Sequence, residues 1–238
     1  MKNYQVIFTF TVAVFLLSSC QKNVVDSEDV VIKPYALQEQ ASEIILEEEE
    51  SAVCGQLRTQ SPGGWGTTPE GFNPATYLAA NFSNAFPWGI MIGCRDGKTL
   101  TLTSAEAVQK FLPAGGKPAM LTDYLIDPVD IKNSLAGHLV SLTLSVGLDY
   151  ADPNFGEAQV SLGDMIISSG AFEGVSVNQF LQYANDAVGG CWSNNYTIGD
   201  LISTASNINN NYLDGTVDMG FLKCPDTGPR RIGEVVPR

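Results

Sequence analysis

The stretch IKNSLAGHLVSLTLSVG, residues 131–147, is the main evidence for the fold class. Apolar side chains recur in it every three to four residues, which places them on one face of an α-helix. These side chains are Ile131, Leu135, Leu139, Leu142 and Val146. The spacing predicts the central core helix of the protein. Serine and threonine lower the helix propensity of this stretch, so a strand over 139–147 is the alternative.

Helical patterns also precede this stretch. Apolar spacing and an early proline predict a helix over 73–86. A second helix is predicted in TSAEAVQKFLPAGG, where Thr103 and Glu106 have the spacing of a capping box and Pro113 ends the pattern.

Two segments after residue 160 begin with cap residues. Ser161 and Asp164 have capping spacing in SLGDMIISSG. Ser176 begins SVNQFLQYANDAVGG, whose terminal glycine pair is a typical end of a helix. We therefore expect helices in both segments.

The last helical pattern lies in TIGDLISTASNINNNYLDG. Thr197 and Asp200 form its capping box, and Gly215 is its expected stop. A clear strand pattern occurs in KTLTLT, residues 98–103, where polar and apolar side chains alternate. The sequence thus predicts a mainly α fold: a single disulfide-stapled helical domain with long loops and little β-structure, after an acidic disordered spacer.

The N-terminus carries the pattern of an export signal. After Lys2, an uncharged run extends from Val6 to Leu17. It is too short to span a bilayer, which needs about 20 apolar residues, and it is typical of the hydrophobic region of a signal peptide. The run ends in Leu17-Ser18-Ser19-Cys20, which resembles the lipobox of bacterial lipoproteins.

This resemblance implies that the chain is cut before Cys20, so that residues 1–19 are a lipoprotein signal peptide. It also implies that Cys20 is acylated, for example with palmitate. Several acyl chains at one terminus give stable membrane attachment, whereas a single chain is marginal. The expected partner is therefore a membrane, and the expected location is the bacterial cell envelope, with the outer membrane or cell surface favoured.

Three further regions follow the signal. Residues 20–53 hold the lipidated cysteine and an acidic spacer, which cannot bury much apolar surface. Residues 54–224 form the globular helical domain, and residues 225–238 form a loose C-terminal tail. The formal net charge of the whole chain is −13, which does not suit nucleic acid as a partner because phosphates repel such a chain.

Four cysteines lie in the domain: Cys54, Cys94, Cys191 and Cys224. An even number of cysteines in an exported chain is typical of disulfides, and the absence of a C-x-x-C pair speaks against zinc. Three pairings are open. We favour Cys54–Cys94 and Cys191–Cys224, because each pair brackets one end of the domain.

Several motifs of the domain occur in a characteristic order. They are Cys54, the Thr59-Gln60 pair, Gly64-Trp65, Trp88, Gly93-Cys94, LTSAEAVQKFL and LAGHLVSLTLSVG. In this order they resemble a secreted bacterial domain of unassigned activity, with a departure at Ser61-Pro62. The resemblance implies an exported, helical, disulfide-bearing module, and it brings no catalytic residue and no cofactor.

The sequence offers little sign of catalysis. Its one histidine, His138, lies beside the apolar stripe and is interpreted as a partly buried helix residue. No G-x-S-x-G elbow and no glycine-rich phosphate loop occurs. A pair of carboxylates could still make a glycan hydrolase. Since the domain has many acids, such a pair carries little information, and whether the chain is an enzyme stays uncertain.

Two sets of residues are candidates for binding. Trp65, Trp88 and Trp192 lie in Gly- or Pro-rich segments near Phe72, Tyr77 and Tyr196, and exposed rings there could stack on sugars. The alternative is that they fill a loop-rich core. The loop DYADPNFGE offers oxygen ligands for calcium from Asp149, Asp152, Asn154 and Glu157, although Asp-Pro-Asn is also ordinary turn chemistry.

These patterns favour a cell-envelope lipoprotein whose domain is a non-catalytic structural or interaction module. The expected partner besides the membrane is a glycan or an envelope protein. The alternatives are a carbohydrate-binding surface module and, less favoured, a carboxylate-dependent glycan hydrolase.

Overall fold

The helical pattern in residues 131–147 corresponds to most of α4, Ser134–Ala151. The computed structural model describes residues 54–191 and 196–226. The predicted signal peptide, Cys20 and the predicted spacer lie outside these residues, as does most of the predicted tail. The strand alternative is wrong, and the helix begins after Ile131, so this side chain is exposed rather than part of the core stripe.

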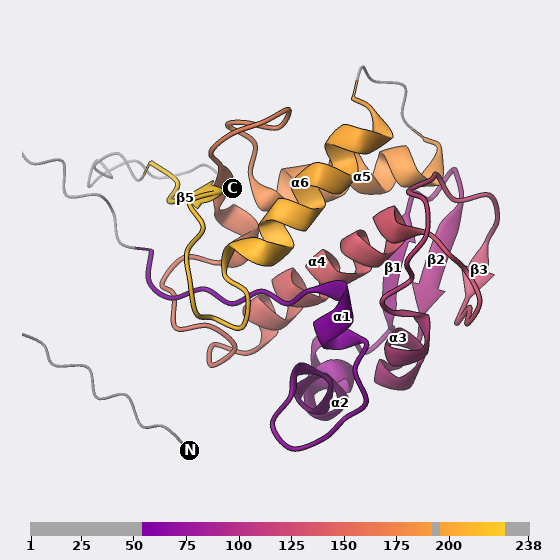
Figure 1. The fold of residues 1–238 in the computed structure, drawn as a ribbon, viewed down its shortest axis with the longest axis horizontal. Coiled ribbons are helices and arrows are strands. Elements are labelled where there is room, and N and C mark those ends of the chain that lie inside the picture. The colour runs from indigo at the N-terminus through magenta and orange to yellow at the C-terminus, as the bar shows by residue number, and fades with distance from the viewer. Residues whose placement is uncertain (1–53, 192–195, 227–238) are drawn as a thin grey trace, which may run out of the picture. The chain divides into compact units, whose positions relative to one another are not determined.

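Helix α4 is buried on nearly all sides because helices pack around it (Figure 1). In Figure 1, α5 and α6 lie on one side of α4 and α1 and α2 on the other. These helices are α1 Pro62–Trp65, α2 Pro74–Ala85, α5 Val177–Gly189 and α6 Ile198–Asn211. A helix that is apolar on most of its circumference belongs in a core, which explains why the pattern in 131–147 is broader than a single stripe.

Several predicted helix ends are confirmed. Ser176 caps α5 by accepting a hydrogen bond from the N–H of Gln179, and Gly190 ends this helix with a left-handed φ of 82°. Thr197 and Asp200 form the expected capping box of α6. Both helices thus begin where the sequence predicts, because the capping side chains satisfy N–H groups that have no partner inside the helix.

Other predicted ends need correction. The cap of α3, Ala105–Phe111, is Ser104, while Thr103 hydrogen-bonds the carboxylate of Asp127. Helix α6 ends at Asn211, before the predicted stop at Gly215.

The segment that begins at Ser161 forms only a 3-10 turn, Leu162–Asp164, without a side-chain cap. It is followed by the short strand β4, Ile166–Ile167. The chain after this turn pairs with its own C-terminal part instead of continuing as a helix.

The β-structure consists of two small sheets in the described residues. β1 Ile90–Gly93, β2 Thr99–Leu102 and β3 Leu125–Ile126 form one sheet, and β4 pairs with β5, Leu222–Lys223. β1 and β2 are antiparallel, with Ile92 opposite Leu100, whereas β2 and β3 are parallel. The predicted strand in 98–103 is confirmed. Helices nevertheless predominate, as a mainly α fold requires.

Two disulfides form, and both differ from the favoured pairing. Cys54 is bonded to Cys224, and Cys94 to Cys191, with Cα–Cα distances of 5.8 Å and 6.2 Å. The proposed Cys54–Cys94 and Cys191–Cys224 pairs are wrong because the two ends of the domain meet. Thr59, shortly after Cys54, forms a bridge with Leu213, so the N-terminal segment lies beside the C-terminal one.

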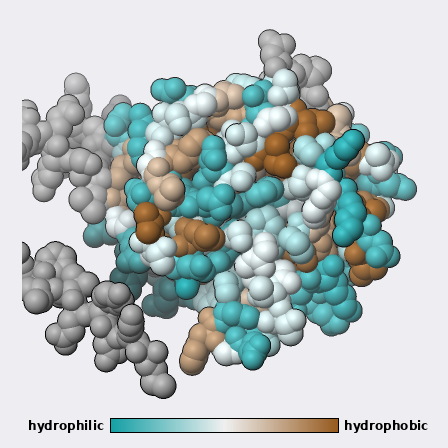
Figure 2. All heavy atoms as spheres, in the orientation of Figure 1, coloured by the Kyte–Doolittle hydropathy of each residue, from teal (hydrophilic) through white to brown (hydrophobic). Residues whose placement is uncertain are grey.

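The surface shown in Figure 2 is mostly hydrophilic or neutral, with scattered hydrophobic residues. None of the helices within 54–191 and 196–226 has the length and apolar character needed to cross a membrane.

Candidate ligand-binding site

Three segments that are far apart in the sequence meet around a pocket of about 360 Å³. They are the N-terminal segment with α1, the start of α2, and the turn after α4. The residues on which its character depends are Arg58, Gln60, Trp65, Phe72, Tyr77 and Phe155.

Aromatic rings form the inner wall of the pocket. The ring of Phe155 stacks on Trp65 at a centroid distance of 6.1 Å and packs against Tyr77 at 5.4 Å. Phe72, in the loop between α1 and α2, is fully exposed beside them. Ligand pockets are typically apolar with a few polar groups, and this pocket has that character.

Local sequence places each of these rings. Ser61 caps α1 by accepting from the N–H of Gly64, and Pro62 fixes the first turn, so Trp65 is held at the end of the helix and is buried. Phe155 follows the turn in which the N–H of Asn154 donates to Asp152. This is the turn chemistry that the Asp-Pro-Asn sequence predicts.

Tyr77 joins α2 to this turn. Its hydroxyl donates a hydrogen bond to Oδ2 of Asp152 at 2.5 Å. Burial, and then this hydrogen bond, raise the pKa of Tyr77 well above its usual value of 10.0. The same hydrogen bond is the main cause that lowers the pKa of Asp152. The hydroxyl therefore stays protonated and the carboxylate ionised at neutral pH.

Arg58 supplies the charge of the pocket. Its guanidinium carbon lies 5.8 Å from the centroid of the Phe155 ring. The neighbouring Thr59 fixes the backbone, since its N–H donates to the carbonyl of Tyr212 at 3.0 Å and its hydroxyl donates to that of Asn209 at 2.9 Å. A rigid backbone and a ring contact thus hold the half-buried arginine in place.

The cation of Arg58 has no ion-pair partner in 54–191 and 196–226. Within these residues, the salt bridge that forms joins Lys110 to Glu106 on α3. Two buried N–H groups at the pocket also lack an acceptor there, Nε of Arg58 and Nε1 of Trp65. Buried donors without a partner cost free energy and are rare in native proteins, so both call for a physical explanation.

This pocket differs in charge from a second hollow beside it. No carboxylate is found among the described residues that line the pocket, where Arg58 is the charged side chain. A second hollow of about 200 Å³ also borders Arg58 and Phe155, but Glu157 and Asp214 line it. The arginine therefore lies between an acidic hollow and an aromatic pocket whose described lining has one cation and no carboxylate.

The structure separates the predicted tryptophans. Trp65 is fully buried and stacks on Phe155, which matches the core-filling alternative. Trp88 is 92% exposed, lies between α2 and β1, and does not line the pocket of Trp65. Trp192 lies outside the described residues. An exposed pair formed by Trp65 and Trp88 is thus not present.

The four predicted calcium ligands are engaged separately. Asp149 accepts a hydrogen bond from the N–H of Leu162 at 2.7 Å, and Asp152 binds Tyr77 and Asn154. Burial raises the pKa of Asp149, which also disfavours its charged form.

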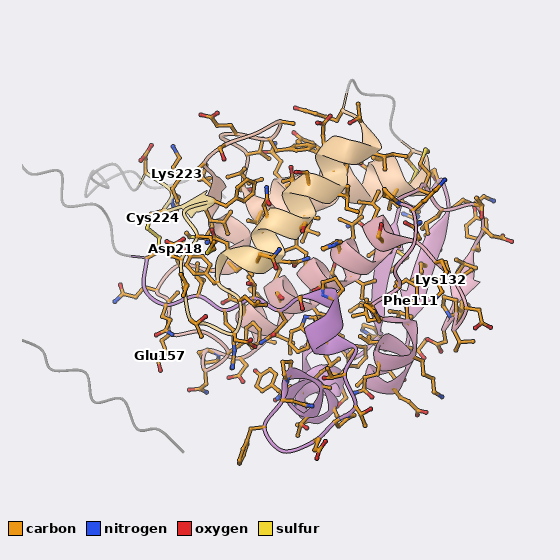
Figure 3. The ribbon with its side chains drawn as sticks, in the orientation of Figure 1. Phe111, Lys132, Glu157, Asp218, Lys223 and Cys224 are labelled. Carbon is orange, nitrogen blue, oxygen red and sulfur yellow. A yellow bond between two sulfur atoms is a disulfide. The ribbon has the colours of Figure 1, made fainter. Side chains whose placement is uncertain are left out.

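Glu157 lies in the acidic hollow, on the side of the domain that carries Asp218 and Cys224 (Figure 3). Among the described residues, no group of three or more His, Cys, Asp or Glu side chains could hold a metal ion. The calcium site stays a prediction, without support from the geometry.

Sequence reasoning missed Arg58 and Phe155. Arg58 is the single basic residue between Cys54 and Cys94, and a lone cation in an acidic chain was a usable signal. Phe155 gave no such signal, because its role depends on a turn that brings it to residues about 90 positions earlier.

Comparisons with known proteins give no family model that matches this chain, no similar curated protein and no similar solved structure.

Proposed function

We propose that this protein is an exported, lipid-anchored binding module that holds a small ligand, or the end of a glycan, in the pocket of Arg58 and Trp65. The ligand is bound and not chemically changed. This is the interaction-module hypothesis with a definite binding site.

One observation carries the proposal: an unpaired arginine faces an aromatic pocket that is open to a ligand. The pocket has the size of a small-molecule site, for which about 300–1,000 Å³ is usual. Its described lining offers hydrogen-bond donors and rings, but no carboxylate, histidine or cysteine for acid–base or nucleophilic steps. Binding without catalysis is the function that such a lining supports best.

Carbohydrate binding is the narrower form of this proposal. The fully exposed ring of Phe72 at the pocket supports it, since an exposed aromatic face can stack on a sugar ring. In this form Phe72 takes the role that the tryptophans have in the sequence-based prediction.

The binding test uses the full chain, purified in a neutral detergent, and ligand-observed NMR with a panel of sugars and small aromatic compounds. We expect at least one compound to bind wild type and to bind Phe72→Ala more weakly. Tyr150→Ala is the matched control, because Tyr150 is also an exposed aromatic residue but does not line the pocket. If no compound distinguishes Phe72→Ala from Tyr150→Ala, the pocket is not the binding site.

The anchor is tested separately. The Leu17–Cys20 motif supports acylation of Cys20, and the two disulfides are consistent with a compartment outside the cytoplasm. Cells that express Cys20→Ala should accumulate a protein that is not processed to the mature size. If Cys20→Ala is processed as wild type and stays in the membrane fraction, the lipid anchor is wrong.

A further inference from the structure

We infer that the ligand of the Arg58 pocket carries a carboxylate next to a flat ring, and that the carboxylate pairs with the guanidinium of Arg58. This inference rests on the proposed function and adds the chemical class of the ligand.

The charge of the pocket lining favours an anionic ligand. The chain has twice as many acidic as basic side chains, 26 against 13, so a region without a carboxylate is unusual in it. The described lining of this pocket has one cation and no anion. An anionic ligand there is attracted by Arg58, and the carboxylate of Asp152, which is hydrogen-bonded to Tyr77, is not part of the described lining. In the neighbouring hollow, Glu157 and Asp214 line the wall and repel an anion.

The donors of Arg58 have a geometry that suits a carboxylate. A guanidinium presents its N–H groups in a planar fork that matches the two oxygens of a carboxylate. The carboxylate of Asp152 is already hydrogen-bonded to Tyr77 and Asn154, and it forms no ion pair with Arg58. The N–H groups of the Arg58 guanidinium are therefore available to an acceptor on a ligand.

Two further donors belong to residues of the pocket but are buried, so they add to the donor character of the wall without touching a ligand. Nε of Arg58 and Nε1 of Trp65 are both donors, and both belong to residues that line the pocket. A carboxylate is a pure acceptor with two oxygens, so it complements a set of donors better than a hydroxyl or an amide does. Both nitrogens are covered by protein atoms, so the first contacts fall to the outer nitrogens of the guanidinium.

The rest of the pocket wall is aromatic. Trp65, Tyr77 and Phe155 form stacked or tilted ring contacts, and Phe72 adds an exposed ring. Rings of this kind favour a flat apolar face on the ligand. A sugar acid and an aromatic acid both combine such a face with a carboxylate, and the experiment separates these two sources.

The experiment measures binding of two matched pairs of probes to the full chain in detergent by NMR or calorimetry. D-Galacturonate is compared with D-galactose, and benzoate with benzamide, so each pair differs in the charged group. We expect the acid of at least one pair to bind more tightly than its neutral partner. The pair that shows this difference identifies a sugar acid or an aromatic acid as the source.

Variants assign the effect to Arg58. Arg58→Gln should weaken binding of the acid roughly tenfold or more, because a hydrogen-bonded charge partner is lost. Arg58→Lys keeps the charge but loses the planar fork of N–H groups. Its affinity for the acid should lie between that of wild type and that of Arg58→Gln. Arg95→Gln is the matched control, since it removes one exposed cation outside the pocket and should leave binding unchanged.

Wild type alone gives a further readout that needs no variant. Binding of the acid should weaken as salt rises from about 0.05 to 1 M, while binding of the neutral partner should not, since the Debye length falls to about 3 Å at 1 M.

Equal binding of acid and neutral partner, or Arg58→Gln that binds as tightly as wild type, overturns this inference. A neutral compound whose binding depends on Phe72 would then still support the pocket as a binding site. If none of the four probes binds, while another compound binds in a Phe72-dependent manner, the carboxylate is wrong and the pocket stands.

Discussion

The hydroxyl of Ser141 on α4 donates a hydrogen bond to the backbone carbonyl of Gln60 at 2.6 Å, and both residues are buried. One turn further along α4, the hydroxyl of Ser145 accepts from the N–H of Gln60 at 3.3 Å. The two serines thus satisfy both backbone groups of one residue that crosses the central helix. In a β-sheet, a neighbouring strand would satisfy these two backbone groups; here two side chains of a helix do so.

Replacement of Ser141 should therefore lower the free energy of unfolding more than removal of a hydroxyl from an exposed helix surface does. We expect Ser141→Ala to lower the free energy of unfolding by about 1–3 kcal/mol, because the carbonyl of Gln60 loses its partner in a buried position. Ser203→Ala on the exposed face of α6 is the control and should change little. Urea unfolding followed by circular dichroism measures both, and equal costs would contradict the role of Ser141.

The disulfides give two predictions, and the first of them needs no variant. Peptide mapping without reduction should yield one linked pair with Cys54 and Cys224 and another with Cys94 and Cys191. Cys94→Ser combined with Cys191→Ser should lose about 2–5 kcal/mol of stability, as is usual for a native disulfide. A peptide that links Cys54 to Cys94 would show that the connectivity described here is incorrect.

Gly97 should be sensitive to any side chain because it lies against the Cys94–Cys191 disulfide. A Cβ at this position would come within 2.6 Å of Sγ of Cys94 and 2.9 Å of Sγ of Cys191, and it would overlap the carbonyl oxygen of Gly189. We expect Gly97→Ala to destabilise the protein by roughly 1–3 kcal/mol through overpacking.

Gly115→Ala is the matched control for Gly97→Ala, since its Cβ would meet no atom within 4 Å. Thermal unfolding of both variants checks the prediction. If Gly97→Ala unfolds at the same temperature as Gly115→Ala, the backbone does not approach the disulfide this closely.

His138 should make stability depend on pH. Burial lowers the pKa of its ring below the usual 6.5, so the unfolded chain binds a proton more readily than the folded protein. The contribution of this ring to the free energy of unfolding is therefore fully present above pH 6.5. It is lost as the pH drops from 6.5 toward the lower pKa of the folded protein.

The measurement is the urea midpoint of wild type and His138→Gln between pH 5.5 and 7.5. The chain has a single histidine, so the difference between the two proteins isolates this ring. The urea midpoint should depend less steeply on pH in His138→Gln than in wild type. Parallel slopes would show that the ring titrates alike in the folded and unfolded states.

Local signals predicted the helices well. The caps of α5 and α6 could be read because a capping side chain contacts N–H groups only two or three residues away. The alternation in β2 was also readable. β3, β4 and β5 were not, since two residues are too few to show a period, and these strands exist only through a distant partner.

The pocket was predictable only in part, for the same physical reason. Trp65 was noticed, but its burial depends on Phe155 in a turn far along the chain. Arg58 matters because no carboxylate from another segment forms an ion pair with it in the described residues, and this is a property of the fold rather than of neighbouring residues.

In chain order, the Cys94–Cys191 disulfide lies inside the Cys54–Cys224 disulfide. This nesting affects how the cell must form the two bonds. A polypeptide is made from its N-terminus, so Cys54 and Cys94 both exist before either of their partners. A thiol oxidase that joins cysteines in order of emergence would link these two to each other, which is the wrong bond. Efficient production of this protein should thus require an enzyme that reshuffles disulfides, and yields in hosts without one should be poor.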